Sequence, residues 1–287
     1  MIKLASYIDH TILKPTTTHI EIEKICGEAV EYGFAAVCVP PPLVPDAVGM
    51  LKPGVSGGVP EQSEGYERGG PWRSRPDEVL RAAGTGEEAA RAADTRRVAP
   101  AAGTGGTGVK VATVIGFPFG YSTVKAKLAE VEQAIADGAD ELDMVINLIA
   151  LKEGRWLLLE EEMRVLTERA HADKKLVKVI IESGVLTEEE IIRCCEVYSR
   201  VGVDFLKTST GYAAVGATVG AVQLMRRHLP TGIRIKASGG IRDAVFAREL
   251  IAAGADRLGC SASVDIVRGD AGPGAVRERS EVGQNEY

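Results

Sequence analysis

Short apolar runs alternate with amphipathic segments along most of the chain. The runs are bounded by glycine, proline or polar residues, as in strands, and the segments repeat apolar residues at helical spacing. Capping boxes at Thr18–Glu21 and Thr187–Glu190 mark the starts of two of the helices. The predicted strands are residues 7–9, 34–39, 109–117, 141–147, 176–181, 205–207, 233–236 and 256–261. The predicted helices are residues 18–33, 43–51, 124–137, 156–171, 187–201, 217–228, 242–253 and 263–267.

The alternation of strands and helices indicates a parallel sheet, because parallel neighbours need a crossover connection. Eight β/α units in the 231 residues outside 53–108 match a closed (β/α)8 (TIM) barrel. An open, doubly wound sheet is the alternative. We favour the barrel because no G-x-G-x-x-G sequence follows the first strand, and because polar residues gather at the carboxyl ends of five strands.

Residues 53–108, between the second helix and the third strand, differ from the rest in composition. These 56 residues hold 12 glycines and 5 prolines, but only 5 residues of the types Leu, Ile, Val and Phe. Such a segment buries too little apolar surface to offset the entropy of ordering it. We expect a disordered insertion within one domain of residues 1–268, followed by a frayed polar tail at 269–287. A solvated insertion, a gene-model error and a docking loop all remain open.

The overall composition limits the classes of partner. A net charge of −6 argues against nucleic acid or an anionic membrane as the main partner, and no apolar run is long enough to span a bilayer. The amino terminus does not resemble a signal peptide, and the five cysteines contain no C-x-x-C pair, so we expect a cytoplasmic protein with reduced thiols. The four histidines do not cluster with cysteines or carboxylates, so no metal or other cofactor is expected.

Two lysines stand at the ends of apolar strands, each followed by small residues and glycine. Lys207 and Lys236 lie in the sequences Phe-Leu-Lys-Thr-Ser-Thr-Gly and Ile-Arg-Ile-Lys-Ala-Ser-Gly-Gly. A lysine there reaches solvent, pairs with a carboxylate, or loses its proton. Neighbouring strands would place the two amines close together, so each would disfavour the charge of the other. A neutral lysine amine can attack a carbonyl group and form a Schiff base.

Polar residues at other strand ends supply the remaining chemistry. Asp143 is the carboxylate suited to moving protons during such a reaction, and Asp9 is a weaker candidate. The last two strands are followed by Ser238-Gly239-Gly240 and by Gly259-Cys260-Ser261. Barrels often bind phosphate at this place, through backbone N–H groups and a helix amino terminus. These features indicate a phosphorylated small-molecule substrate.

The chain resembles the deoxyribose-phosphate aldolase family in four motifs. They are Ile8-Asp9-His10-Thr11, Glu141-Leu142-Asp143, Leu206 to Gly211 and Ile235 to Arg242. The resemblance implies a metal-free class I aldolase that reversibly cleaves 2-deoxy-D-ribose 5-phosphate to D-glyceraldehyde 3-phosphate and acetaldehyde. It further implies that Lys207 forms the Schiff base, that Lys236 lowers the pKa of Lys207 and shares in proton transfer, and that Asp143 moves protons with an ordered water. The expected substrate-binding residues are Asp9, Thr208, Gly211, Ser238, Gly239, Gly240, Gly259 and Ser261. We also expect a homo-oligomer, either a dimer or a tetramer.

The chain departs from the family pattern in three places. Tyr212 and Ala213 stand where many members have glycine-rich or basic residues, and Cys260-Ser261-Ala262 holds one serine where a pair of hydroxyl residues is usual. The third departure is the insertion. Two other functions stay open: an aldolase for another phosphorylated aldol, and a non-catalytic barrel that binds a phosphosugar.

Overall fold

A computed structural model of the chain describes residues 3–52 and 107–270. Within these ranges, eight parallel strands close into a barrel in sequence order, each beside the next, with β8 beside β1. The strands are β1 (Ile8–Thr11), β2 (Ala36–Val39), β3 (Lys110–Ile115), β4 (Glu141–Val145), β5 (Leu176–Ile180), β6 (Phe205–Lys207), β7 (Arg234–Ser238) and β8 (Arg257–Cys260). The prediction of a (β/α)8 barrel is therefore confirmed, and the open sheet is excluded.

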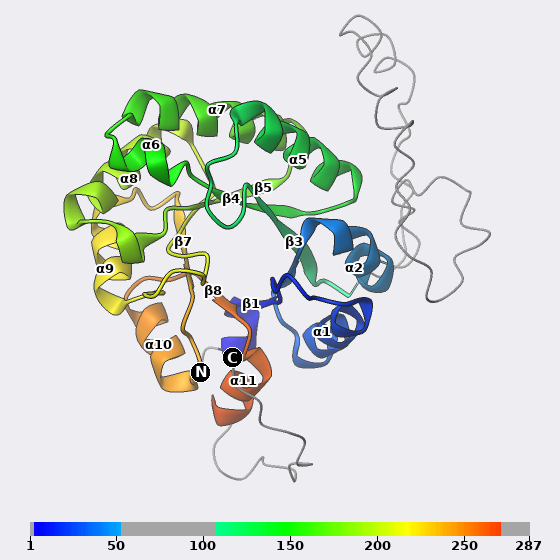
Figure 1. Cartoon of the computed structure of the whole chain (residues 1–287). Helices are drawn as coiled ribbons and strands as arrows, with labels where there is room; N and C mark the ends of the chain where they lie inside the picture. Colours follow the sequence, from blue (N-terminus) through cyan, green and yellow to red (C-terminus); the bar gives the residue numbers. More distant parts are fainter. Residues whose placement is uncertain (1–2, 53–106, 271–287) are drawn as a thin grey trace, which may run out of the picture. The chain divides into compact units, whose positions relative to one another are not determined.

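Helices surround the barrel on its outside (Figure 1). They are α1 (His19–Tyr32), α2 (Val44–Leu51), α5 (Val124–Ala136), α6 (Leu148–Lys152), α7 (Trp156–Ala172), α8 (Glu188–Val201), α9 (Val219–His228), α10 (Ala244–Ala252) and α11 (Ser263–Asp270). Three short 3-10 helices, η1 (Leu4–Tyr7), η2 (Pro41–Leu43) and η3 (Ser183–Val185), complete the described elements. Both predicted capping boxes form, at the starts of α1 and α8. The short helix α6 was not predicted.

The main hydrophobic core lies between the strands and the helices. Successive side chains of a strand point to opposite faces, so half of each strand packs against the helices and half points into the barrel. Ile8, Val37, Leu142 and Leu206, for example, are fully buried in the cluster shared with the helices. Each such side chain contributes about 1.5–3 kcal/mol of burial. The inward half is free to carry other chemistry.

The predicted insertion falls almost entirely on residues 53–106, which lie outside the described residues, as do residues 271–287 of the predicted tail. Residues 269 and 270 belong to α11, so the helix continues beyond the predicted start of the tail. The residues that flank the insertion are close together, because the Thr107 hydroxyl donates to the Leu51 carbonyl at 3.2 Å. These flanks lie at the amino ends of the strands, since Lys52 pairs at 2.7 Å with Asp140, which precedes β4.

Candidate active site

Charged side chains gather in the interior of the barrel. The strand register sets Asp143 beside Lys178 and Lys207 beside Lys236, so these four point inward together. Asp143 is at the centre of the group. Its Oδ1 accepts from Lys178 at 2.7 Å, and its Oδ2 accepts from Lys207 at 2.7 Å and from Lys236 at 2.8 Å. The structure thus brings together the three predicted catalytic residues, Lys207, Lys236 and Asp143.

A second layer of charges supports the first. Asp9 pairs with Lys236 at 2.5 Å and accepts two hydrogen bonds from Arg257. Glu141 pairs with Lys178 at 2.6 Å and with Arg257 at 3.1 Å. Lys178, Glu141 and Arg257 were not predicted as site residues. The sequence does contain a signal for Lys178, because this lysine, like Lys207 and Lys236, lies in an apolar strand.

The groups that pair directly with one another carry one positive charge more than negative, and Glu182 is a further buried carboxylate near Lys207. Lys178, Lys207, Lys236 and Arg257 supply four cations, while Asp9, Glu141 and Asp143 supply three carboxylates. A buried, unbalanced charge is expensive, so one group is driven toward its neutral form. Loss of a proton from one lysine would bring the cluster to neutrality.

Lys207 is the lysine that gives up its charge most readily. Burial lowers its pKa; Asp143 acts against this, and nearby Lys236 lowers the pKa further, so that the net direction is downward. Burial also acts to lower the pKa of Lys236, but Asp143 and Asp9 more than reverse it, and the pKa is raised. If each lysine disfavours the charge of the other, the pKa of both should be lowered. This is so for Lys207, but it is wrong for Lys236, whose pKa is raised. The difference follows from the partners, since Lys207 meets one carboxylate and Lys236 meets two.

Asp143 and Asp9 remain ionised. Burial alone would raise the pKa of Asp143, but Lys178, Lys207 and Lys236 together hold it well below its usual range. The same balance lowers the pKa of Asp9, where Lys236 and Arg257 overcome the effect of burial. In the resting site Asp143 is thus an anion that accepts hydrogen bonds from two lysines at one oxygen.

A pocket of about 540 Å³ leads from solvent to Lys207. We call it the lysine pocket. It is lined by Lys207, Gly211, Tyr212, Ser238, Gly239, Gly240, Arg242, Gly259 and Ser261, and by residues of the β1–α1 loop and of α1. Two residues expected to bind substrate, Asp9 and Thr208, do not line it. Asp9 is buried beneath Lys236, and the Thr208 hydroxyl pairs with the backbone of Ser238.

Glycines shape the side of the lysine pocket that faces β7 and β8. Gly239 and Gly240 have φ angles of +86° and +76°, which other residues rarely adopt. A Cβ atom on Gly259 would lie 2.9 Å from Ser238 and 3.1 Å from Lys236. The Ser238 hydroxyl donates to the Ser209 carbonyl at 2.5 Å, so backbone N–H groups and Ser261 are the better placed donors for an anion.

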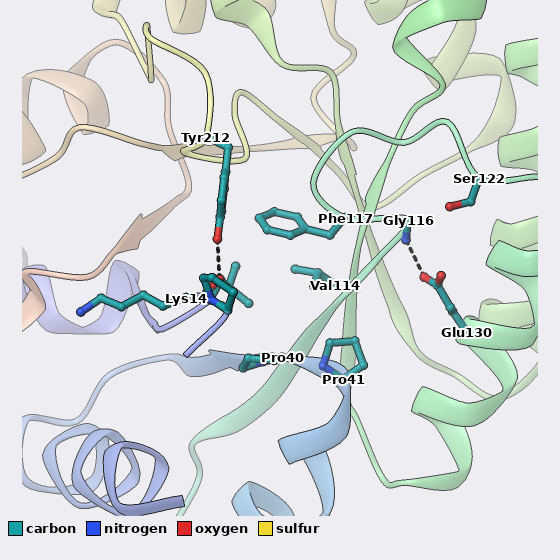
Figure 2. Close-up of a pocket in the computed structure, with 11 residues that line it drawn as sticks. Lys14, Pro40, Pro41, Val114, Gly116, Phe117, Ser122, Glu130 and Tyr212 are labelled. Carbon is teal, nitrogen blue, oxygen red and sulfur yellow. Dashed lines mark hydrogen bonds between the residues drawn. The ribbon is translucent and has the colours of Figure 1, made fainter. Parts of the chain in front are cut away.

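Tyr212 crosses the barrel mouth, as Figure 2 shows. Its hydroxyl donates to the Leu13 carbonyl at 2.8 Å, and its ring meets that of Phe117 edge-on, with 5.4 Å between the ring centres. The Tyr212 hydroxyl is therefore already hydrogen-bonded, and Tyr212 does not take the place of a basic residue that would bind phosphate. Beyond it lies a second pocket of about 320 Å³.

Two further findings bear on the type of site. Burial raises the pKa of the Cys38 thiol to about 11, which keeps this inward-facing residue protonated and unreactive at neutral pH. Within residues 3–52 and 107–270, no group of His, Cys, Asp and Glu side chains has the arrangement of a metal site. The helices in these ranges include none that is both long and apolar enough to cross a membrane.

Comparison with known proteins gives consistent matches. Residues 65–276 match the model of the DeoC/LacD family of aldolases. The deoxyribose-phosphate aldolase of Geobacillus sp. is 40% identical over 266 residues, which cover 93% of this chain and 95% of that protein. The enzyme of the same name from Streptococcus gordonii is 40% identical over 272 residues, covering 95% and 99%. The deoxyribose phosphate aldolase structure from Aeropyrum pernix, described as a unique tetramer, matches with a TM-score of 0.69, 26% identity and coverage of 94% and 91%.

Proposed function

The chain belongs to the DeoC/LacD family of aldolases, and we propose that it cleaves 2-deoxy-D-ribose 5-phosphate reversibly to D-glyceraldehyde 3-phosphate and acetaldehyde. The observation that carries the proposal is the position of Lys207. It is the lysine of the buried cluster that meets a single carboxylate, has a lowered pKa and lines the lysine pocket. The names of the curated relatives support the choice of substrate.

Lys207 is the nucleophile in the proposed mechanism. Its neutral Nζ attacks C1 of the open-chain sugar, and loss of water from the carbinolamine gives a protonated imine. The C3 hydroxyl then loses its proton, the C2–C3 bond breaks, and its electron pair moves into the iminium group to give an enamine. Glyceraldehyde 3-phosphate leaves. Protonation of the enamine carbon and addition of water release acetaldehyde and restore the amine.

Asp143 and Lys236 move and stabilise charge around this nucleophile. Asp143 Oδ2 contacts both amines, so it can pass a proton between the C3 hydroxyl, Lys236 and the nitrogen of Lys207, directly or through a water. The raised pKa of Lys236 keeps that residue cationic, which favours the neutral form of Lys207. Asp9 has a positioning role in this scheme, because it holds Lys236 in its charged state and does not reach the pocket.

The phosphate of the substrate lies, in this proposal, at the glycine-lined side of the lysine pocket. Gly211, Gly239, Gly240 and Ser261 line that side, and α11 begins two residues after Ser261 with its amino terminus nearby. Backbone N–H groups and a helix amino terminus attract anions. The distance between this side and Lys207 would be spanned by the five-carbon sugar.

We also propose that residues 1–268 form a single aldolase domain, interrupted by residues 53–108, in a cytoplasmic homo-oligomer. All five cysteines are free and buried, which suits a reducing compartment. The tetramer described for the Aeropyrum pernix enzyme supports assembly.

Comparison of substrates tests the proposed function. The purified full-length chain should cleave 2-deoxyribose 5-phosphate with a kcat/KM at least about 100-fold above that for ribose 5-phosphate or fructose 1,6-bisphosphate, since those carry an extra hydroxyl at the carbon that must become the enamine. Preference for another phosphorylated aldol would assign a different aldolase. Binding without turnover of any of them would indicate a phosphosugar-binding barrel.

A further inference from the structure

Glu182 is a buried carboxylate that the proposed mechanism does not use. It follows the end of β5 by two residues and lines neither of the two pockets described above. Its φ angle is +54°, in the left-handed region that residues other than glycine seldom adopt. In the described ranges only one other residue besides glycine, Lys174, has a positive φ angle. A residue held in this conformation points to a contact that its side chain makes.

That contact is with the loop that follows β6. The Thr210 N–H donates to both carboxylate oxygens of Glu182 at 3.3 Å, and the Thr210 hydroxyl donates to Oε2. Thr210 Oγ1 in turn accepts from the Tyr212 N–H at 3.1 Å, and the Tyr212 hydroxyl donates to the Leu13 carbonyl. Glu182 therefore starts a chain of hydrogen bonds that runs from the end of β5 across the barrel mouth to the loop after β1.

Glu182 stands apart from the charged cluster around Asp143. Lys207 is a nearby cation, but its Nζ pairs with Asp143. Burial raises the pKa of Glu182 and outweighs the effects of Thr210 and Lys207, which act to lower it. The Glu182 carboxylate is thus held in place by hydrogen bonds from Thr210, whereas Asp143 is held by lysines.

The hydrogen bonds of Glu182 and Thr210 leave one N–H group of the loop available. The N–H groups of Thr210 and Tyr212 are engaged, whereas that of Gly211 between them has no acceptor among the described residues. The N–H groups of Gly239 and Gly240 also have no acceptor within these ranges. All three glycines line the lysine pocket, and a Cβ atom on Gly239 would lie 3.4 Å from the Cα of Gly211. Three such N–H groups therefore lie at the side of the pocket proposed to hold phosphate.

The far end of the same loop is fixed against β7. A Cβ atom on Gly216 would lie 2.3 Å from the Gly239 carbonyl oxygen. The Ala217 N–H donates to the carbonyl groups of Ser238 and Gly239 at 3.0 and 3.1 Å. Gly211 thus lies between two fixed points of the loop, and Glu182 provides the one next to it.

We propose that Glu182 is a positioning residue for the phosphate of the substrate: it fixes Thr210 so that the Gly211 N–H stays directed at the bound anion. This inference rests on the proposed function. Glu182 itself does not touch the substrate. Its loss should weaken binding of the phosphorylated sugar, because a displaced Gly211 no longer donates to the phosphate together with Gly239 and Gly240. The reaction of Lys207 with acetaldehyde, which carries no phosphate, should be unchanged.

Variants at both ends of the contact test the proposal. Glu182→Gly removes the carboxylate and suits the left-handed backbone. Lys174→Gly is its matched control, because Lys174 has a φ angle of +56°, is exposed and precedes β5 at the other end of the barrel. Thr210→Val removes the hydroxyl at nearly constant shape, and Thr210→Ser keeps it. Each full-length variant is measured for kcat and KM with 2-deoxyribose 5-phosphate, and for the rate of borohydride-trapped acetaldehyde adduct on Lys207 across pH.

We expect the KM for 2-deoxyribose 5-phosphate to rise at least about tenfold in Glu182→Gly and Thr210→Val, with adduct formation at the wild-type rate and pH profile. Thr210→Ser and Lys174→Gly should behave as the wild type. Adduct formation shows that a variant is folded, and if Glu182→Gly does not fold, the comparison of Thr210→Val with Thr210→Ser decides.

Three results would overturn the inference alone. They are an unchanged KM in a folded Glu182→Gly or Thr210→Val variant, an equal loss of sugar cleavage and adduct formation, and a displaced pH profile of adduct formation, which would assign Glu182 to the charge of Lys207. Absence of adduct formation or of sugar cleavage in the wild type would instead overturn the proposed function.

Discussion

Replacing Lys236 with methionine should make Lys207 harder to deprotonate. Both amines contact the same oxygen of Asp143, and the distances of 2.7 and 2.8 Å place the two nitrogens no more than 5.5 Å apart. Two unit charges at that separation repel by about 3 kcal/mol at an effective dielectric constant of about 20. This corresponds to a factor of roughly 100 in the fraction of neutral amine. Loss of Lys236 also frees Asp143 to hold the Lys207 ammonium more tightly, which acts in the same direction.

The assay is the rate of borohydride-trapped acetaldehyde adduct as a function of pH, because this step needs the neutral amine but not cleavage of a carbon–carbon bond. Lys236→Met should form the adduct about 100-fold more slowly at neutral pH and regain rate as the pH rises. Lys127→Met is the matched control, since Lys127 is a buried lysine that pairs with Glu162 at 3.0 Å outside the site. A pH profile of Lys236→Met equal to that of the wild type, or displaced to lower pH, would refute the reasoning.

Four further predictions follow from the charge balance and the topology. Lys207→Met should abolish adduct formation without lowering the thermal midpoint at neutral pH, because the fold lowers the pKa of Lys207 and its charged form costs stability until the pH rises toward 10.5. Asp143→Asn should lower kcat by about 10²–10⁴ and the free energy of unfolding by about 3–5 kcal/mol, since it leaves buried cations unpaired. The lowered pKa values of Asp9 and Asp143 contribute stability that is present above about pH 4 and is lost as the pH falls further, which circular dichroism in denaturant can follow. Deletion of residues 53–106 should leave kcat/KM within about twofold, and a loss of activity in a folded deletion variant would contradict the placement of its flanks away from the mouth.

The fold could be predicted because each β/α unit carries local signals. Caps at Thr18 and Thr187, glycines such as Gly33 at helix ends and continuous apolar runs in the strands agree with one another. The sequence did not predict the helix Leu148–Lys152, because its five residues are too few to show helical periodicity. Its start at the Asn147 cap becomes clear only when the backbone is seen.

Only part of the site could be predicted from the sequence, because some of the residues that contact one another lie far apart along the chain. Lys207 and Lys236 share a local signature, and a barrel must bring their strand ends together. Lys178 has the same apolar flanks, but three apolar residues follow it where small residues and glycine follow Lys207 and Lys236, so it lacks their local signature. The pairing of Glu141 with Arg257 joins residues 116 positions apart, and only the closed register shows it.

The sequence could not show that the pKa of Lys207 is lowered while the pKa of Lys236 is raised. Their local contexts are alike, and burial lowers the pKa of both. The number of carboxylates around each amine decides the outcome, and that number depends on Asp9, which enters from β1 on the far side of the closure. The closed barrel, and not the local sequence, therefore determines which carboxylates contact which lysine.

The most direct test of the central claim is the location of the covalent adduct. The full-length enzyme is reduced with borohydride in the presence of acetaldehyde, digested, and its peptides are mapped by mass spectrometry. We predict a reduced two-carbon adduct on Lys207 and none on Lys178 or Lys236, because those two lysines are held as ammonium ions by two or more carboxylates. An adduct on Lys236 alone, or no adduct on any of the three, would contradict the assignment of Lys207 as the nucleophile.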